Sequence, residues 1–332
     1  MIATNGKNLN VQWFCHNHVI EHYSIFALTS KYASDILKIE HYSIFKEKKM
    51  KQVIYYFSGT GNSLRAAIKI AERLGNTELI SMRNNPDEVS AEDCGIIGFV
   101  YPVYHWTMPK PAVEFVKALK INPKAYIFAI SMPSFINGYA CEKLSELLTE
   151  KGASLNYGQK VNSVANYILV YPPMPFPRLT VPMTERRLNR FAEDIAMRKN
   201  KPYPKAGVMV RVRRDKMMTP YLELQKYADY PFTVSDKCIS CGLCSQVCPC
   251  KNIIMENGTP SFQHHCAQCM ACVVFCPERA IGYDITAKDK KLLSSSSNKT
   301  KLVKLMGLPA KRKRYHNPYI TAADLIKNSI WF

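Results

Sequence analysis

The sequence predicts an α/β domain built on a parallel sheet, followed by a small cysteine-rich domain. Residues 51–74 have the pattern of a buried strand, a glycine-rich loop and an amphipathic helix in direct succession. Strand-like and helical patterns then alternate up to about residue 199, which is typical of α/β proteins. Between residues 238 and 276 the pattern changes, because cysteine becomes the commonest residue there.

The first strand, loop and helix lie in KQVIYYFSGTGNSLRAAIKIAERL, residues 51–74. The apolar run that opens this stretch is expected for a strand buried on both faces of a parallel sheet. After the loop, apolar residues recur at helical spacing, namely at Leu64, Ala67, Ile68, Ala71 and Leu74. Gly75 follows in a position suited to end the helix.

The loop SGTGNS, residues 58–63, has the composition of a phosphate cradle. Its glycines allow a sharp turn in which backbone N–H groups converge on an anion, and its hydroxyl groups can donate as well. The loop matches neither the lysine-containing P-loop nor the G-x-G-x-x-G dinucleotide fingerprint. The candidate phosphate-binding residues are Ser58, Gly59, Thr60, Gly61, Asn62 and Ser63.

This stretch resembles the phosphate loop of flavodoxins, which binds the monophosphate of FMN after the first strand. The resemblance implies a flavodoxin-like, doubly wound parallel sheet. Further strands are then expected at 78–82, 95–101, 126–131 and 161–169, alternating with helices near 110–120, 138–151 and 184–199.

In a flavodoxin-like sheet the flavin lies beyond the carboxyl ends of the first and third strands. Two loops are expected there, VYPVYHWTMPKP at 100–111 and SMPSFINGYA at 131–140. The resemblance implies that flavin-ring neighbours come from these loops, and the candidates are Tyr101, Tyr104, His105, Trp106, Phe135, Asn137 and Gly138. Tyr104 or Trp106 either stacks on the ring or packs locally, and His105 either tunes or protonates the flavin or is a polar loop residue.

The run CISCGLCSQVCPC, residues 238–250, raises the question of what so many close thiols bind. Disulfides need an oxidising compartment, and the N-terminal residues lack the basic start and apolar core of a signal peptide, so reduced thiols are expected. Zinc usually takes two cysteines from each of two knuckles, whereas C-x2-C-x2-C offers three from one loop. Followed by Cys248 and Pro249, this run is the bacterial iron-sulfur pattern.

The pattern occurs twice. A shift of 28 residues superimposes Cys238, Cys241, Cys244, Cys248 and Pro249 on Cys266, Cys269, Cys272, Cys276 and Pro277. Two such runs resemble the small α+β bacterial ferredoxins with two [4Fe-4S] clusters, in which the fourth cysteine of each run crosses to the other cluster. The resemblance implies a first cluster held by Cys238, Cys241, Cys244 and Cys276, and a second cluster held by Cys266, Cys269, Cys272 and Cys248.

The remaining cysteines are expected to bind no metal. Cys250 aligns with Glu278 in the repeat, and a carboxylate does not replace a thiolate in this coordination, so Cys250 is expected to be a spare thiol at a surface position. Cys15, Cys94 and Cys141 stand alone in the sequence. We expect them to be small apolar packing residues.

Taken together, the motifs between about residues 51 and 285 resemble proteins of anaerobes that fuse a flavodoxin-like domain to a two-cluster ferredoxin. The resemblance implies an oxidoreductase-type flavoprotein that transfers electrons between FMN and two clusters, and onward to or from a redox partner. Two alternatives stay open. One is a flavin-dependent reductase of a small molecule reloaded through the clusters, and the other is a basic iron-sulfur binding or sensing module.

The expected domains are an N-terminal extension (1–49), a flavodoxin-like FMN-binding domain (50–200), a linker (201–229), a two-cluster ferredoxin domain (230–285) and a basic C-terminal tail (286–332). The formal net charge is +19, and Lys and Arg gather in KEKKMK, RVRRDK, KDKK and KRKR. Solvated surface explains most such runs, and the sharper interpretation is an acidic redox partner, since no motif supports nucleic acid. No apolar stretch reaches the length of a membrane span, and a cytoplasmic location is expected.

Residues 1–49 are expected to lie outside the functional protein. They repeat IEHYSIF at 20–26 and 39–45, which is too few copies for a solenoid. Met50 directly precedes the first strand, and codons for Lys46 and Glu47 can spell the ribosome-binding sequence AAGGAG, so Met50 is a candidate natural start. The alternative is a genuine helical extension.

Overall fold

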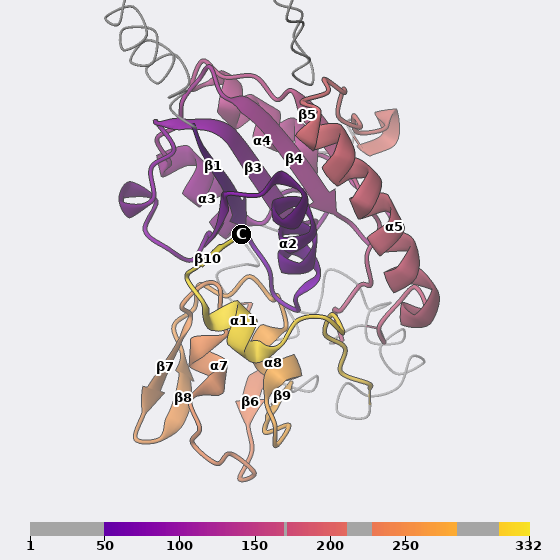
Figure 1. The fold of residues 1–332 in the computed structure, drawn as a ribbon. Helices are drawn as coiled ribbons and strands as arrows, with labels where there is room; N and C mark the ends of the chain where they lie inside the picture. Colours follow the sequence, from indigo (N-terminus) through magenta and orange to yellow (C-terminus); the bar gives the residue numbers. More distant parts are fainter. Residues whose placement is uncertain (1–49, 169–170, 211–227, 284–311) are drawn as a thin grey trace, which may run out of the picture. The chain divides into compact units, whose positions relative to one another are not determined.

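The computed structural model describes residues 50–168, 171–210, 228–283 and 312–332 (Figure 1). Its main sheet contains five parallel strands, β1 (Lys51–Tyr56), β2 (Thr77–Ser81), β3 (Cys94–Pro102), β4 (Tyr126–Met132) and β5 (Tyr157–Lys160). These strands lie in the order β2-β1-β3-β4-β5. This order is that of flavodoxin-like doubly wound folds, in which the reversal next to β1 creates a binding crevice at the carboxyl ends of the strands.

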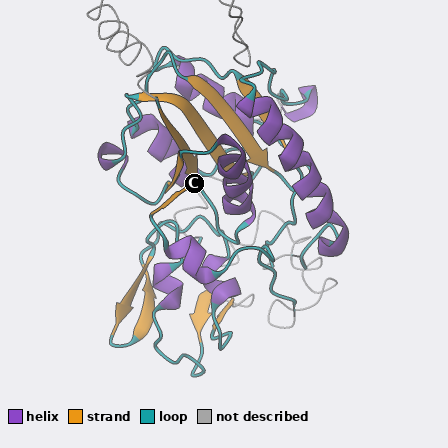
Figure 2. Ribbon diagram, viewed as in Figure 1, coloured by secondary structure: helices purple, strands orange, loops and turns teal. Residues whose placement is uncertain are grey.

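Helices cover both faces of this sheet (Figures 1 and 2). On one face lie α2 (Asn62–Leu74) and α5 (Pro177–Ala196), and on the other lie α3 (Lys110–Ala118) and α4 (Ala140–Thr149). A short 3-10 helix, η1 (Pro86–Glu88), follows β2. Since both faces are covered, each strand buries its side chains in two directions, which explains the continuous apolar runs in the sequence.

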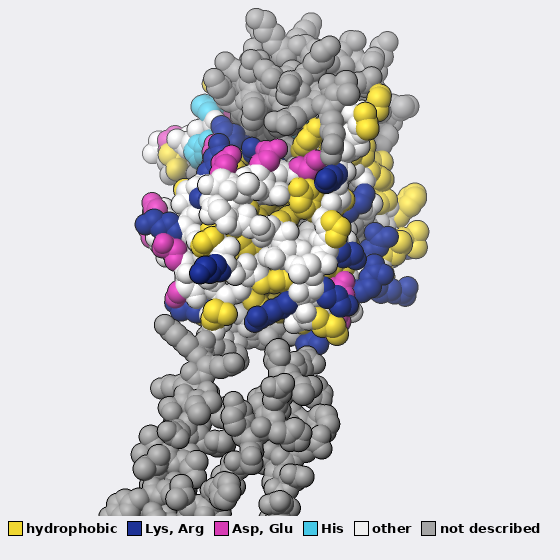
Figure 3. All heavy atoms as spheres, turned by 90° about the horizontal axis from the view of Figure 1, so that it is seen from above, with side chains coloured by type: hydrophobic (Ala, Val, Ile, Leu, Met, Phe, Trp, Pro, Cys, Tyr) yellow, Lys and Arg dark blue, Asp and Glu magenta, His cyan; other side chains and the backbone are white. Residues whose placement is uncertain are grey.

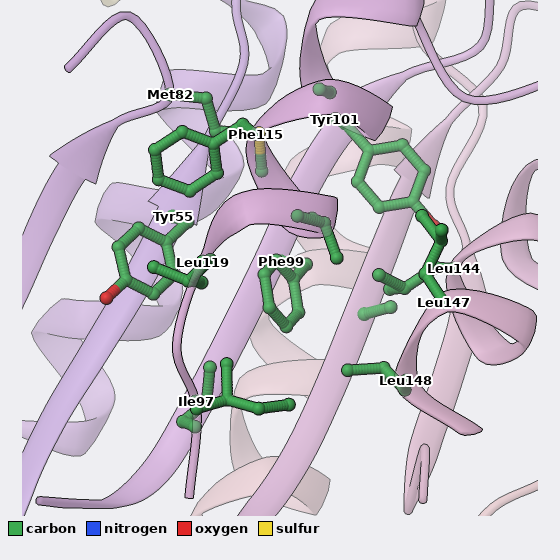
Figure 4. Packing of buried hydrophobic residues seen from close by; sticks show 14 of the residues in the cluster. Tyr55, Met82, Ile97, Phe99, Tyr101, Phe115, Leu119, Leu144, Leu147 and Leu148 are labelled. Carbon is green, nitrogen blue, oxygen red and sulfur yellow. The ribbon is translucent and has the colours of Figure 1, made fainter. Parts of the chain in front are cut away.

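The alternation of side chains along β1 divides the core into two layers. Ile54 and Tyr56 pack with the side chains of α2 and α5, whereas Tyr55 packs with those of α3 and α4. Figure 4 shows the second layer, in which Phe99 lies between the strands and the leucines of α4. Tyr55 and Phe99 stack with ring centroids 5.8 Å apart. The sheet is therefore a rigid support for the loops at its carboxyl edge.

Two ion pairs join α2 to α5. Arg65 donates to both carboxylate oxygens of Glu185 at 3.1 and 2.7 Å, and Arg73 pairs with Glu193 at 2.7 Å. The first pair is largely buried and bidentate, a geometry that fixes the relative position of two helices better than an exposed pair does. Because Arg65 lies in the first turn of α2, the first half of α5 is held beside the loop that precedes α2.

Two expected elements differ from the structure. The strand expected at 161–169 is absent from the described part of that range, and β5 lies earlier, at Tyr157–Lys160. Val161, Val164 and Ile168 are nevertheless buried, because the segment packs as a loop on the core rather than as a strand. The helix expected at 184–199 is α5, which begins earlier, at Pro177, although Pro182 lies inside it.

The cysteine-rich region contains two small antiparallel pairs of strands. One pair is β6 (Phe232–Val234) with β9 (Ile281–Tyr283), and the other is β7 (Ile253–Glu256) with β8 (Thr259–Phe262). Two short helices, α7 (Leu243–Gln246) and α8 (Ala271–Phe275), follow the two cysteine loops. This is a small α+β arrangement in which each half of the repeat supplies one helix and strands, as the 28-residue repeat predicts.

The C-terminal residues join the flavodoxin-like sheet. Helix α11 (Ala322–Ile326) is followed by β10 (Ser329–Trp331), which pairs antiparallel with β2 at the edge of the sheet. Residues 312–332, which were expected to belong to a basic tail at 286–332, therefore include a helix and a strand of the folded domain. Pairing satisfies the backbone groups along the exposed edge of β2, which is why so short a strand forms at this position. Residues 1–49 lie outside the described residues.

Candidate FMN and iron-sulfur sites

The loop between β1 and α2 has the turn that its glycines predict. Gly61 adopts a left-handed conformation with φ of 95°, and its N–H donates to the Ser58 hydroxyl at 3.2 Å. The side chains of Ser58, Thr60 and Ser63 are all buried at the amino end of α2. The loop thus presents the start of a helix, where unpaired N–H groups and the helix dipole favour a phosphate.

The loop after β3 contains a tight turn with two strained residues. Tyr104 and Thr107 exchange both backbone hydrogen bonds at 3.0 Å, and the two residues between them, His105 and Trp106, have φ of 47° and 65°. Glycine or asparagine usually occupies such positions, because a side chain at positive φ is disfavoured. Strain of this kind is often found in binding sites.

The loop after β4 is attached directly to this turn. Tyr139 donates its N–H to the carbonyl oxygen of Trp106 at 2.6 Å. Gly138, with φ of 54°, lies so close that an added Cβ would be 2.7 Å from the carbonyl carbon of Trp106. The two loops expected to border the flavin ring therefore form one unit at the carboxyl edge of the sheet.

The expected ring neighbours have different environments. Trp106 is 37% exposed and Phe135 is 54% exposed, whereas Tyr104 is partly buried and its ring meets that of Phe57 edge to face at 6.3 Å. Asn137 is buried and accepts a hydrogen bond from Ser131 at 2.5 Å. Its side chain therefore braces the loop from inside the protein.

Tyr101, by contrast, does not border the crevice as expected. It ends β3 with a fully buried ring, and its hydroxyl donates to the carbonyl oxygen of Ala140 at 3.1 Å (Figure 4). Ile136 of the same loop was not among the expected ring neighbours, and it is half exposed beside Phe135. Its apolar type alone gave no signal, because apolar residues are also common on ordinary surfaces. Contact of any of these residues with the flavin ring stays a prediction.

The four cysteines assigned to the first cluster line one cavity of the cysteine-rich region. Cys238, Cys241, Cys244 and Cys276 share it with apolar residues that include Ile239, Leu243 and Ile281. Cys244 lies within electrostatic range of both Cys241 and Cys276. The cysteine from the second run thus reaches the first group, as the crossover of the ferredoxin pattern requires.

The four cysteines assigned to the second cluster also interact with one another. Cys266 lies near Cys269 and Cys248, and Cys272 lies near Cys269, Cys266 and Cys248. Cys250 also lies near Cys269, Cys248 and Cys266, so proximity by itself does not distinguish the ligands. Backbone N–H groups donate to sulfur in both groups, from Asn252 to Cys248 at 3.3 Å, from Gln268 to Cys266 at 3.2 Å and from Ala280 to Cys276 at 3.2 Å. Such hydrogen bonds favour thiolates and tune cluster potentials.

The surroundings of these thiols fit a cluster with a positively charged iron-sulfide core. Burial raises the pKa of the Cys244 thiol to about 11 and that of the Cys269 thiol to about 12. A bare thiolate is therefore unfavourable here, and bound iron supplies the compensating positive charge. No three His, Cys, Asp or Glu side chains of the described residues converge as they would on a single ion. In a [4Fe-4S] cubane each thiolate binds a different iron, so the sulfurs surround the cluster rather than meet at one point.

Cys250 does not lie at the surface position expected for it. It is partly buried and packs against both the flavodoxin core and the core of the cysteine-rich region. The reason is that the flavodoxin-like domain covers this side of the cysteine-rich region, which an alignment of the two cysteine runs does not reveal. Cys94 and Cys141 are buried, as expected for packing residues, while Cys15 lies outside the described residues.

Two family models match separate parts of the chain. A flavodoxin domain matches residues 53–161, and a 4Fe-4S dicluster domain matches residues 207–281. The fold and the two sites thus define a flavoprotein that also carries iron-sulfur clusters. More specifically, the chain is a fused flavodoxin and ferredoxin protein, whose cofactors are FMN and two [4Fe-4S] clusters.

Several solved structures are similar in fold to part of the chain. The FMN-bound flavodoxin of Fusobacterium nucleatum has 12% identity and a TM-score of 0.33 over 46% of this chain and 99% of its own. The FMN-dependent NADH-azoreductase of Bacillus anthracis has 9% identity and a TM-score of 0.36 over 45% and 98%. Rubredoxin oxygen:oxidoreductase of Desulfovibrio gigas has 16% identity and a TM-score of 0.32, and the match covers 50% of this chain. This chain therefore spans only 40% of the length of that protein.

The comparison with curated proteins finds no match. Within the described ranges, no helix has the length and apolar character needed to cross a membrane.

Proposed function

We propose that this chain conducts electrons between its FMN and an acidic partner protein, with the second cluster next to the flavin and the first cluster next to the partner. The observation that carries the proposal is the contact between the phosphate loop and the second cysteine loop. A Cβ at Gly59 would lie 2.7 Å from the Cβ of Cys269 and overlap the carbonyl oxygen of that residue. Only glycine permits so close an approach of the two loops.

Further contacts support the same placement of the second cluster. Ala267 is buried within the flavodoxin core layer formed by α3 and α4. Arg83, which follows β2, donates to the carbonyl oxygen of Gln246 at 2.6 Å, and Tyr167 donates to Gln268 at 2.9 Å. Tyr167 and the burial of Ala267 thus hold the loop that carries Cys266 and Cys269 on the flavodoxin-like domain, while Arg83 contacts α7 of the first cysteine run.

The first cluster has the more accessible surroundings. Cys241 is exposed, and the neighbouring Ile239 is 61% exposed. In the other group Cys248 and Cys272 are buried, and Cys266 and Cys269 are partly buried. Because electron transfer between proteins needs a close approach of the cofactor to the surface, these residues support an exit at the first cluster.

The division of chemistry follows from the cofactors. FMN exchanges two electrons and can do so one at a time, whereas each cluster exchanges one. The residues of the chain hold the cofactors in sequence, exclude water from the second cysteine loop and supply N–H groups to the thiolates.

Charge supports an acidic partner. The net charge is +19, and the outer face of α5 carries exposed arginines beside exposed apolar side chains. The arginines are Arg178, Arg186, Arg187 and Arg190, and the apolar residues are Phe176, Leu179 and Met183. Figure 3 shows basic and hydrophobic side chains gathered on the side where α5 lies in Figure 1, while acidic and basic side chains mix on the opposite side. A basic surface of this kind attracts acidic proteins.

The order of the cofactors can be tested by removing one cluster at a time. In Cys266→Ala and Cys241→Ala holoproteins, the flavin is photoreduced without oxygen and the clusters are followed by rapid-freeze electron paramagnetic resonance. We expect Cys241→Ala to keep fast reduction of the remaining second cluster. Cys266→Ala should lose rapid reduction of the remaining first cluster, because the intermediate carrier is missing.

Equal rates in the two variants would refute the order. Rapid oxidation of the flavin by a small molecule, with clusters that never oxidise a protein acceptor, would instead favour a small-molecule reductase. Flavin-free protein that still binds its partner would favour a binding or sensing module.

A further inference from the structure

The segment that begins at Arg312 links the two cofactor domains and lies outside both matched family ranges. Asn317 donates its N–H to the carbonyl oxygen of Thr60 at 2.8 Å and its side-chain amide to Asn62 at 3.2 Å. One residue earlier, His316 packs on the ring of Phe275 with centroids 5.1 Å apart. The same short segment therefore contacts the phosphate loop and the helix that follows the second cysteine loop.

Arg314 of this segment donates hydrogen bonds to the backbone near cysteines of both groups. Its guanidinium donates to the carbonyl oxygens of Val273, Arg279 and Ile281, the last two at 3.3 and 3.2 Å. Among the described residues these hydrogen-bond partners are neutral carbonyl groups. The guanidinium is half-buried, and none of these hydrogen bonds within the described ranges reaches a carboxylate.

The three carbonyl groups lie next to ligands of different clusters. Val273 follows Cys272 of the second group, while Arg279 and Ile281 follow Cys276 of the first group. Burial lowers the pKa of Arg314, and the positive charge of Arg279 lowers it further, whereas negative charge on Cys276, and less strongly on Cys272, raises it. Since an arginine keeps its proton in proteins, these thiolates face a permanent positive charge.

We propose that Arg314 is a positioning residue that raises the reduction potential of the clusters, above all that of the first cluster, to which Cys276 belongs. Reduction adds negative charge to a cluster. A fixed cation nearby favours that state, and partial burial keeps solvent and salt from screening it. The inference uses the assignment of Cys276 as a ligand and does not depend on the route of electrons proposed above.

A purely structural role is the rival explanation. Arg314 caps the carboxyl end of α8, and a basic side chain at that end stabilises a helix whether or not a cluster is present. The two roles affect different measurable quantities. A helix cap affects the stability of the protein and its iron content, whereas a charge beside a cluster shifts the reduction potential of that cluster.

The test compares Arg314→Gln, Arg314→Lys and Lys313→Gln in the full holoprotein. Lys313→Gln is the matched control, since it removes the same charge from the adjacent, exposed position. Each protein is assayed for iron and FMN and titrated potentiometrically without oxygen, with the clusters followed by electron paramagnetic resonance. We expect a more negative potential for the first cluster in Arg314→Gln, and potentials close to the unsubstituted protein in Arg314→Lys and Lys313→Gln.

Full iron content with an unshifted potential in Arg314→Gln would overturn the proposal. If Arg314→Gln keeps only part of its iron, the potential of the first cluster that remains decides: a more negative value supports the proposal, and an unshifted value overturns it. If both variants lose iron but keep FMN, packing rather than charge explains the residue, and the proposal is wrong. The rate of electron transfer from flavin to clusters is measured separately in the unsubstituted protein. A failure of the proposed electron route is therefore distinguished from a failure of the proposal for Arg314.

Discussion

At the residue scale, three of the cysteines assigned to the clusters have a hydrogen-bond donor in their immediate surroundings. Cys248, Cys266 and Cys276 each accept a backbone N–H, and each of these donors lies two to four residues further along the chain. The turns that present the thiols therefore also supply the hydrogen bonds that stabilise them as thiolates. This is why ligands and their hydrogen-bond donors occur within one short motif.

Substitution of single cysteines should separate ligands from packing residues. We expect Cys276→Ala to lose the iron of one cluster, about four atoms, because the ferredoxin pattern assigns Cys276 as the crossover ligand. Cys250→Ala should keep all of the iron, with a small loss of stability from its partly buried site. Iron content per flavin measures cluster retention in both variants, and chemical denaturation measures the loss of stability. Loss of about four irons from Cys250→Ala would contradict the ligand assignment.

At the element scale, the crevice at the edge of the sheet depends on two loops that share a hydrogen bond. The Trp106 turn is held in a strained conformation, and the backbone of Gly138 and Tyr139 packs directly against it. Because such strain persists only when neighbouring structure compensates for it, the second loop is needed to keep the first in place.

Alanine at Gly138 should therefore disturb the flavin site. Gly138→Ala adds a clash with Trp106 to the cost of a side chain at positive φ, and we expect a loss of stability of about 3 kcal/mol and weaker FMN binding. Gly152→Ala is the control, because Gly152 also has positive φ but has no neighbour within 4 Å of an added Cβ. It should cost about 1 kcal/mol and leave FMN affinity unchanged. Chemical denaturation and flavin titration measure these effects, and equal behaviour of the two variants would show that the clash is unimportant.

The sequence predicts elements well where the pattern is local. The buried strands β1 to β4 lie within a residue or two of their expected positions, because burial on both faces leaves a continuous apolar run. β10 was not predicted, since a three-residue strand has no periodicity and forms only by pairing with a strand far away in the chain. The burial of Cys250 and the contacts of Arg314 are likewise consequences of tertiary packing.

At the scale of the whole molecule, a basic chain joins two redox domains through contacts that lie beside the cofactors. The first half of α5 is held next to the phosphate-loop helix by Arg65 and Glu185, so that Arg186 and Arg187 present positive charge near the flavin end of the sheet. On the proposed function, this positive charge would orient an acidic partner protein toward the cofactors.

Electron transfer should depend on salt with a sign set by the acceptor. Because attraction between opposite charges is screened beyond about 8 Å at physiological ionic strength, we expect the rate to an acidic ferredoxin to fall as salt rises, and the rate to the basic cytochrome c to rise. Substitution of Arg186 and Arg187 by Gln should slow association with the acidic acceptor several-fold at low salt. The control replaces the exposed Lys120 and Lys124, between α3 and β4, by Gln and so removes the same amount of charge. It should slow association with the acidic acceptor less. Stopped-flow kinetics over a range of salt concentrations measures each rate, and a salt dependence of the same sign for both acceptors would exclude steering by the basic surface.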